Sequence, residues 1–135
     1  FVDVLYGDGH RNALRVRQDD DTLVGGGGGD TLLGNQGADL LEGGAGADTL
    51  IGSGGSDYLA GGSDNYVIDG RADQGDGPKD DGVDSLFGGT GNDQLFLDNG
   101  DQAEASKPVA EDHLALKHRG DAGPYGSAYI NASPI

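Results

Sequence analysis

Leucine returns every nine residues through the first part of the chain. The seven positions are Leu5, Leu14, Leu23, Leu32, Leu41, Leu50 and Leu59. The residue two places before each leucine is polar, and it is Asp in all units but one: Asp3, Asn12, Asp21, Asp30, Asp39, Asp48 and Asp57. Glycines fill most other places, so the best-defined units follow the pattern G-G-x-G-x-D-x-U-x, where U is apolar. A repeat of this length indicates a chain built from stacked copies of one small unit.

Each unit predicts a turn followed by a short strand. Glycine tolerates positive φ and close backbone approach, which suits G-G-x-G-x-D to a tight turn rather than to the interior of an element. The residues x-U-x extend, and strand alternation points the central side chain inward and its neighbours outward. Two units then close one coil, and successive coils stack about 4.8 Å apart. We therefore expect an all-β parallel solenoid with two inward rows: Leu5, Leu23, Leu41 and Leu59 on one sheet, and Leu14, Leu32 and Leu50 on the other.

The composition supports this fold and restricts the partners. Gly accounts for 28 of the 135 residues, about three times the usual frequency, which excludes a conventional helical bundle. The formal net charge is -16, and 21 of the 24 acidic residues are Asp. Nucleic acids and anionic membrane surfaces would repel such a chain, because binding them depends on Lys and Arg. No apolar run is long enough to span a membrane, so membrane insertion is not expected.

Stacking brings the periodic carboxylates together and so predicts a metal. Asp21, Asp39 and Asp57 should stack on one edge of the solenoid, and Asp30 and Asp48 on the other. Like charges about 5 Å apart would destabilise the fold unless a dication lay between the coils. The available ligands are carboxylates and turn carbonyls, and the chain has no Cys. Such hard oxygen donors suit Ca²⁺ and are poor for Zn²⁺ or Cu²⁺, whereas Mg²⁺ prefers to keep its waters.

These residues resemble the RTX family of hemolysin-type calcium-binding nonapeptide repeats, most specifically over residues 19–60. The resemblance implies a right-handed parallel β-roll with several Ca²⁺ ions, each bound between turns two repeats apart. It implies carboxylate ligands from the periodic Asp residues and carbonyl ligands from the glycine turns. A second, shorter block of repeats covers residues 82–96. The metal-site residues predicted in both blocks are Asp21, Gly25, Gly27, Gly28, Asp30, Gly34, Gly37, Asp39, Gly43, Ala45, Gly46, Asp48, Gly52, Gly54, Gly55, Asp57, Asp84, Gly88, Gly91 and Asp93.

The repeat decays at its start and is interrupted at residues 61–81. His10 and Val16 occupy glycine positions, so the first coil is expected to bind metal weakly or not at all. Leu86 stands three periods after Leu59, which predicts two degenerate repeats in the gap. There Tyr66 falls where Asp is needed, or Asp64 serves a shortened repeat instead.

Two features of this region leave alternatives open. The acidic segment 69–81 is either an extra irregular Ca²⁺ site or a solvated loop, and it does not follow the EF-hand spacing. In the second block, Asp84 and Asp93 lack carboxylate partners eighteen residues away, so their sites are less well defined.

The glycine period stops after Leu97, which predicts a β-roll over residues 1–97 and a small C-terminal cap and tail over 98–135. Acidic residues begin the segment 111–119 and basic residues end it, which favours a short capping helix. His113 and His118 lie in this segment and are interpreted as solvated cap residues rather than metal ligands. The tail could be the uncleaved C-terminal signal of type I secretion, as the family resemblance implies.

Outward strand positions predict a surface. Leu33 and Ile51 should lie side by side on one sheet, and Val24, Leu40 and Tyr58 on the other. Either a small solenoid exposes these residues without consequence, or the rows contact the rest of a larger chain, a neighbouring copy or a ligand.

No catalytic motif is present, so we expect a non-enzymatic calcium-binding module. It would belong to a secreted or cell-surface protein, fold on Ca²⁺ binding after export, and serve structural or adhesive roles, with self-association among them. The alternative is the C-terminal domain of a secreted hydrolase, such as a protease, lipase or polysaccharide-modifying enzyme, with its catalytic domain upstream. Binding a polyuronate glycan is disfavoured by charge unless calcium bridges the two. The chain has no Met and begins with Phe1, which suggests a mature product or fragment.

Overall fold

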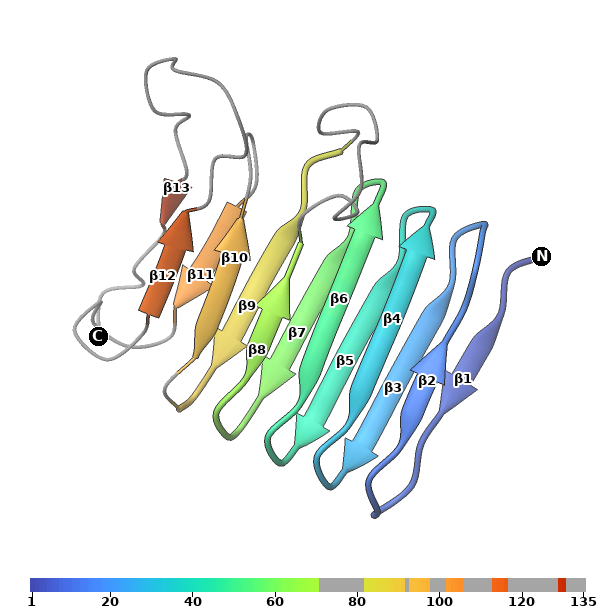
Figure 1. The fold of residues 1–135 in the computed structure, drawn as a ribbon, viewed down its shortest axis with the longest axis horizontal. Coiled ribbons are helices and arrows are strands. Elements are labelled where there is room, and N and C mark those ends of the chain that lie inside the picture. The colour runs from blue at the N-terminus through green and yellow to red at the C-terminus, as the bar shows by residue number, and fades with distance from the viewer. Residues whose placement is uncertain (71–81, 92, 98–101, 106–112, 117–128, 131–135) are drawn as a thin grey trace.

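The protein is a two-sheet parallel solenoid, seen in a computed structural model that describes residues 1–70, 82–91, 93–97, 102–105, 113–116 and 129–130 (Figure 1). These residues form strands and no helix. One sheet contains β1 (Val4–Tyr6), β3 (Thr22–Gly27), β5 (Leu40–Ala45), β7 (Tyr58–Gly62), β9 (Ser85–Gly89), β11 (Gln102–Ala105) and β13 (Tyr129–Ile130), in that order. The other contains β2 (Ala13–Arg15), β4 (Thr31–Gln36), β6 (Thr49–Gly54), β8 (Val67–Asp69), β10 (Gln94–Leu97) and β12 (His113–Leu116). The predicted all-β parallel solenoid is confirmed.

The nine-residue period sets the register of both sheets. Each strand pairs in parallel with the strand two places further along the chain, because a coil contributes one strand to each sheet. The two predicted leucine rows are confirmed: the pairs are Leu5–Leu23, Leu23–Leu41 and Leu41–Leu59 in one sheet, and Leu14–Leu32 and Leu32–Leu50 in the other.

Each strand between β3 and β9 places one large apolar side chain in the narrow core between the sheets. The leucines at positions 23, 32, 41, 50 and 59 are fully buried, as are Ile68 and Leu86. Leu5 and Leu14 are only partly buried, because β1 and β2 lie at the edges of their sheets. A core with one such residue per half-coil is thin, so the turns must contribute much of the stability.

The strands continue beyond x-U-x into the glycine turn. β3 includes Gly25, Gly26 and Gly27, so the expectation that these glycines belong only to a turn is wrong. The reason is that successive turns stack closely enough to extend the parallel pairing, with Gly26 opposite Gly44. Gly46 shows why glycine is needed: its φ is 117°, and a Cβ there would clash with the carbonyl oxygen of Gly28.

One coil is longer than the others. Leu59 of β7 pairs directly with Leu86 of β9, and only β8 lies between them in the chain, with Ile68 in register with Leu50. Two degenerate repeats would have placed Leu86 in the opposite sheet, so that prediction is wrong. The additional residues form an insertion within one coil. Asp73, Asp76, Asp80 and Asp81 of the acidic segment lie outside the described residues.

The sheets continue beyond Leu97. His113–Leu116 forms β12, which pairs in parallel with β10, so the short helix predicted over 111–119 is wrong in this part; the flanking residues lie outside the described ranges. The charge distribution favours a helix locally, but pairing with the open edge of β10 satisfies the backbone and overrides that preference. In the tail, Tyr129–Ile130 pairs with β11. No helix in the described ranges could cross a membrane.

Candidate metal centre

Seven carboxylates at the sixth position of the repeat are buried at the ends of the coils. They are Asp21, Asp30, Asp39, Asp48, Asp57, Asp84 and Asp93, all 3% exposed or less. An ionised carboxylate is costly to bury unless a partner compensates its charge. Among the described residues, the ion pairs Phe1–Asp19 and His10–Asp8 lie at exposed positions and involve none of Asp21, Asp30, Asp39 and Asp48.

The sixth positions form two ladders. We call the positions before the odd-numbered strands the odd edge: Asp3, Asp21, Asp39, Asp57 and Asp84. The positions before the even-numbered strands form the even edge: Asn12, Asp30, Asp48, Tyr66 and Asp93. Backbone-to-carboxylate hydrogen bonds join neighbouring coils along each edge. The predicted stacking of carboxylates on two separate edges is therefore confirmed.

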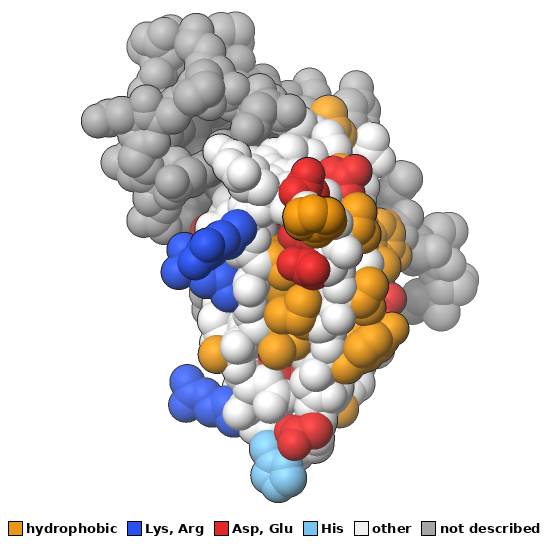
Figure 2. Space-filling view, turned by 90° about the vertical axis from the view of Figure 1, so that its right-hand side faces the viewer, with side chains coloured by type: hydrophobic (Ala, Val, Ile, Leu, Met, Phe, Trp, Pro, Cys, Tyr) orange, Lys and Arg blue, Asp and Glu red, His pale blue; other side chains and the backbone are white. Residues whose placement is uncertain are grey.

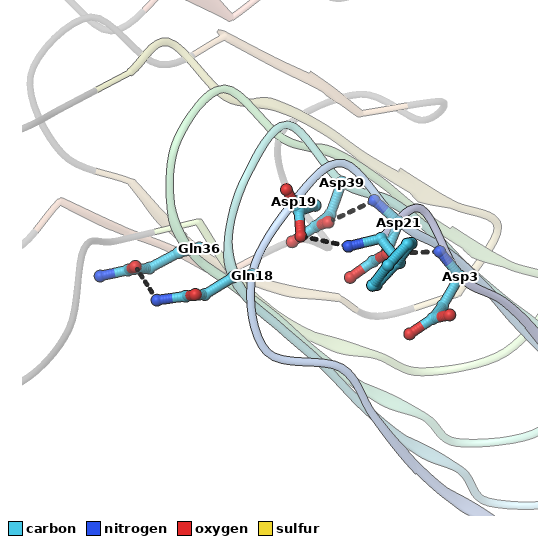
Figure 3. Close-up of polar contacts among 7 residues, drawn as sticks. Asp3, Gln18, Asp19, Asp21, Gln36 and Asp39 are labelled. Carbon is cyan, nitrogen blue, oxygen red and sulfur yellow. Dashed lines mark hydrogen bonds and ion pairs between the residues drawn. The ribbon is translucent and has the colours of Figure 1, made fainter.

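One oxygen of each carboxylate holds the ladder together. On the odd edge, Oδ1 of Asp21 accepts a hydrogen bond from the backbone N–H of Asp3 at 2.7 Å, and Oδ1 of Asp39 accepts one from Asp21 at 2.8 Å (Figure 3). On the even edge, Oδ1 of Asp48 accepts one from Asp30 at 2.7 Å. These bonds link each coil to the next, but a neutral amide leaves the carboxylate charge in place.

The second oxygen is available for another ligand. Oδ2 of Asp21, Asp30, Asp39 and Asp48 is buried and accepts no hydrogen bond from the described residues. A buried, unsatisfied acceptor of this kind is rare and needs an explanation, for which an ion is one candidate.

The orphan oxygens lie beside glycines and carbonyl groups. A methyl group added to Gly25 would lie 2.5 Å from Oδ2 of Asp30 and 2.6 Å from the carbonyl oxygen of Gly43 in the next coil. A methyl group added to Gly43 would similarly lie 2.5 Å from Oδ2 of Asp48 and 3.0 Å from the carbonyl oxygen of Gly61. Glycine at these positions therefore lets a carboxylate oxygen and a carbonyl oxygen from two adjacent coils approach the same place.

This donor set fits Ca²⁺. Within the described part of the chain, no three His, Cys, Asp or Glu side chains gather in one place. Any metal in the turns must therefore take much of its coordination from backbone carbonyl groups. Carboxylate and carbonyl oxygens are ligands that Ca²⁺ accepts in flexible numbers, whereas Zn²⁺ sites rely on His and Cys.

Only some of the predicted ligands lie close together. The first glycine of the turn lies beside a carboxylate in the pairs Gly25–Asp30, Gly34–Asp39, Gly43–Asp48, Gly52–Asp57 and Gly88–Asp93. By contrast, the carbonyl groups of Ala45 and Gly54 accept hydrogen bonds from the N–H groups of Gly28 and Gly37. The carbonyl group of Gly28 lies against Gly46, and that of Gly37 against Gly55. Which carbonyl groups bind the ion therefore stays a prediction, including the carbonyl groups of Gly27 and Gly91.

The turn before Asp21 departs from this arrangement. Val16 stands in the place of the first glycine, and its side chain is buried. The side-chain amide of Asn35 donates a hydrogen bond to the carbonyl oxygen of Val16 at 2.5 Å. Both features occupy the turn with protein groups, and they support the expectation that the first coil binds metal weakly.

The second block finds its partners across the long coil. Oδ1 of Asp84 accepts from the N–H of Asp57, and Oδ1 of Asp93 accepts from the N–H of Tyr66, each across 27 residues. The eighteen-residue spacing did not predict these partners, because the insertion lengthens this coil. Gly70 lies beside Oδ2 of Asp84 and was also missed. The preserved leucine frame gave no signal for the longer spacing, because it fits two degenerate repeats equally well.

Tyr66, and not Asp64, occupies the carboxylate position of its repeat. Ile68 keeps the register of the leucine row, which places Tyr66 two residues before it on the even edge. Asp64 is exposed, and its Oδ2 accepts a hydrogen bond from the N–H of Gly46 at 3.0 Å. The shortened repeat centred on Asp64 is therefore not formed.

Burial makes two ladder carboxylates harder to ionise. The pKa of Asp39 is raised above its ordinary value of 3.8, chiefly by burial, with repulsion from Asp21 adding to the shift. The pKa of Asp48 is raised for the same reason, with Asp30 and Asp64 as the neighbouring charges. The folded calcium-free chain therefore holds these protons more tightly than the unfolded chain. Its stability falls as the pH rises from about 3.8 through the raised values.

We expect acid to weaken calcium binding for this reason. Protons compete with Ca²⁺ for the carboxylates of Asp39 and Asp48, so the apparent affinity should be constant above the raised pKa values and should fall below them. The expected loss is about tenfold per pH unit for each proton displaced. Calorimetric titrations with CaCl₂ from pH 7.5 down to pH 3.8, the ordinary pKa of an Asp carboxyl group, would measure it. An affinity that stays constant down to that pH would contradict the assignment of these carboxylates as ligands.

A parallel β-solenoid whose stacked turns offer carboxylate and carbonyl oxygens defines the class of calcium-binding β-rolls. The chain belongs to the family described as RTX calcium-binding nonapeptide repeat (4 copies), which it matches over residues 2–32, 33–68 and 80–101, more than half of its length. Comparisons with curated proteins and with solved structures gave no match. Family membership agrees with the donor set and identifies Ca²⁺ as the ion that the repeats bind.

Proposed function

We propose that this protein is a structural module, not an enzyme, that folds when Ca²⁺ fills the turns of residues 1–97, with residues 98–135 acting as a cap and tail. The observation that carries the proposal is the set of buried Oδ2 atoms in Asp30, Asp39 and Asp48, which lack a hydrogen-bond donor among the described residues. For Asp30, Asp39 and Asp48, a carbonyl oxygen of the next coil lies at the same place.

The need for calcium follows from the electrostatics of the ladders. Each ladder stacks carboxylates at one coil end, and the described residues contain just three Lys or Arg side chains: Arg11, Arg15 and Arg17. These cations lie near the first coils, and the formal net charge of the chain is -16. Ions between the coils would convert repulsion into attraction, so that binding and folding become one process.

This dependence suits a secreted or cell-surface protein. Calcium is scarce in bacterial cytosol and abundant outside cells, and extracellular modules bind it with a Kd of roughly 0.1 to 1 mM. A chain that stays unfolded until it meets such concentrations could pass through a type I secretion channel and then fold. Sequencing the gene on both sides of this chain, and testing export of the chain with and without its tail, would examine this part of the proposal.

The folded module would present a rigid surface for structural or adhesive contacts. Leu33 and Ile51 lie in register on one sheet, as expected, and Leu40 and Tyr58 do so on the other. Figure 2, which looks at the molecule from the side of the N-terminal coils, shows hydrophobic side chains gathered in rows on the surface. β1 and β2 end their sheets, and open strand edges favour pairing with another copy. Particle size in calcium at increasing protein concentration would test self-association.

Calorimetric titration tests the central proposal. Adding CaCl₂ to the calcium-free chain at pH 7.5 should give saturable binding of several ions with a Kd of roughly 0.1 to 1 mM. MgCl₂ should give much weaker binding, because Mg²⁺ requires nearly ideal octahedral geometry and retains its waters. Absence of saturable calcium binding, or equal affinity for the two ions, would refute the proposal.

A further inference from the structure

Tyr66 interrupts the row of carboxylates on the even edge. It lies between Asp48 and Asp93 in that ladder, and its side chain is 1% exposed. Its backbone keeps the ladder connection, since its N–H donates to Oδ1 of Asp93 at 3.1 Å. Tyrosine in place of aspartate at this position therefore changes which groups fill the turn, and it leaves the stacking of the coils unchanged.

The hydroxyl of Tyr66 joins two successive turns. Oη donates a hydrogen bond to the carbonyl oxygen of Gly44 in the previous coil at 2.7 Å. It accepts hydrogen bonds from the N–H groups of Ser63 and Asp64 in its own turn at 2.8 and 3.3 Å. One donor and two acceptor sites are what a phenol hydroxyl offers, so its bonding capacity is complete. Burial raises the pKa of Tyr66 above 10.0, so the hydroxyl stays neutral at physiological pH.

The ring of Tyr66 stands beside the first glycine of its turn, where the other turns place a carboxylate oxygen. A methyl group added to Gly61 would lie 2.7 Å from both Cγ and Cδ2 of Tyr66. At Gly25 and Gly43, the equivalent methyl group would meet a carboxylate Oδ2 instead. The carbonyl oxygen of the next coil, that of Gly88, lies 2.6 Å from the same methyl position. The residues of this turn therefore do not fit calcium, because an uncharged ring, and not a carboxylate oxygen, stands beside that carbonyl oxygen.

We propose that Tyr66 takes the place of a calcium ion, closing its turn against the previous coil through its own hydroxyl and dividing the metal row of the even edge into two parts. This inference rests on the proposed function, because it assumes that the carboxylate-bearing turns bind calcium. The inference adds that the residue at the sixth position of each repeat sets the number of bound ions. It also adds that the contact between the Tyr66 turn and the previous coil forms without metal. This contact lies in the long coil, where the insertion separates β8 from β9.

The number of bound ions tests the proposal. Native mass spectrometry and calorimetry of the full chain in calcium should give one more bound ion for Tyr66→Asp than for the wild type. Tyr58→Asp is the matched control, because Tyr58 is 43% exposed and its ring packs at a tilt against Phe87 outside the turns. This variant should bind as many ions as the wild type. A folded Tyr66→Asp variant with the wild-type number of ions would overturn the proposal.

A second variant decides the question if Tyr66→Asp does not fold. Tyr66→Phe keeps the ring and loses the hydroxyl, so it should bind the wild-type number of ions. The amide of Asp64 should then exchange hydrogen about tenfold faster in saturating calcium, because its N–H loses the hydroxyl that accepts it. The N–H of Ser63 keeps a second acceptor, the carbonyl oxygen of Gly44 at 3.4 Å, and should change less. Tyr58→Phe should change neither the ion number nor the exchange. Unchanged exchange at Asp64, or an additional ion in Tyr66→Phe, would overturn the proposal, whereas a wild-type chain that binds no calcium would refute the proposed function itself.

Discussion

Chelation of calcium should remove most of the strand structure of this protein. At a tenfold excess of Ca²⁺ over Kd, each site contributes about 1.4 kcal/mol, so four sites contribute about 5 to 6 kcal/mol. This equals the net stability of many domains, which is roughly 5 to 15 kcal/mol. The core is thin, and 28 glycines give the unfolded chain a high conformational entropy. Far-ultraviolet circular dichroism in EGTA and in about 5 to 10 mM Ca²⁺, a range that exceeds the expected Kd, would measure the change.

The control must separate specific binding from screening of the net charge. The same experiment with MgCl₂, and with NaCl at matched ionic strength, should leave most of the chain unfolded, since screening alone provides no ligand for the buried oxygens. Equal strand content in EGTA and in calcium would show that the chain folds despite repulsion between the ladder carboxylates. Recovery of strand content in NaCl alone would show that screening of the net charge is enough for folding.

Replacing Asp39 with Asn should weaken calcium binding more than any similar change at an exposed carboxylate. The amide oxygen can still accept the hydrogen bond from the N–H of Asp21, which Oδ1 of Asp39 accepts at 2.8 Å. The other oxygen becomes an NH₂ group, which repels a cation. Because Asp39 has carboxylates on both sides, at Asp21 and Asp57, we expect the loss of at least one ion and a fall in affinity on the order of tenfold or more, equivalent to about 1.4 kcal/mol.

Two comparison variants make this result specific. Glu42→Gln removes the same charge from an exposed position on β5 and should leave the affinity nearly unchanged. Asp93→Asn should have a smaller effect than Asp39→Asn, because Tyr66 rather than a carboxylate precedes Asp93 on the even edge. Calorimetry would compare the variants. Equal effects at Asp39 and Asp93 would contradict the pairing of ladder neighbours, and equal effects at Asp39 and Glu42 would reduce the role of Asp39 to its contribution to net charge.

The regular coils could be predicted because every level of the sequence agrees there. The leucine period requires two inward rows, and the same period places a carboxylate at the start of every strand from β3 to β7. Leucines, carboxylates and glycines then all meet the equivalent residue eighteen positions further along the chain. Stacking of the carboxylates was predicted from this period, whereas their burial was not. The different roles of Oδ1 and Oδ2 were not predicted either, since they depend on where each backbone N–H points.

The irregular parts were harder because local patterns there are compatible with several partners. The frame from Leu59 to Leu86 is satisfied equally by two weak repeats or by one repeat and an insertion. Only the pairing of β7 with β9 distinguishes them. The segment around His113 has a helical charge pattern, yet the open edge of β10 recruits it as a strand. In both cases, a contact between residues far apart in sequence determines the outcome.

The sequence alone determined the parallel coil, the two leucine rows and the two carboxylate edges, because a strict nine-residue period leaves no other register in which all these residues repeat. The tertiary structure decided which groups meet across the coils. It paired Asp57 with Asp84 over the insertion, and it placed the Tyr66 hydroxyl against the carbonyl group of Gly44. These contacts depend on the path of the backbone between the repeats and on side-chain length, and neither is recorded in the period.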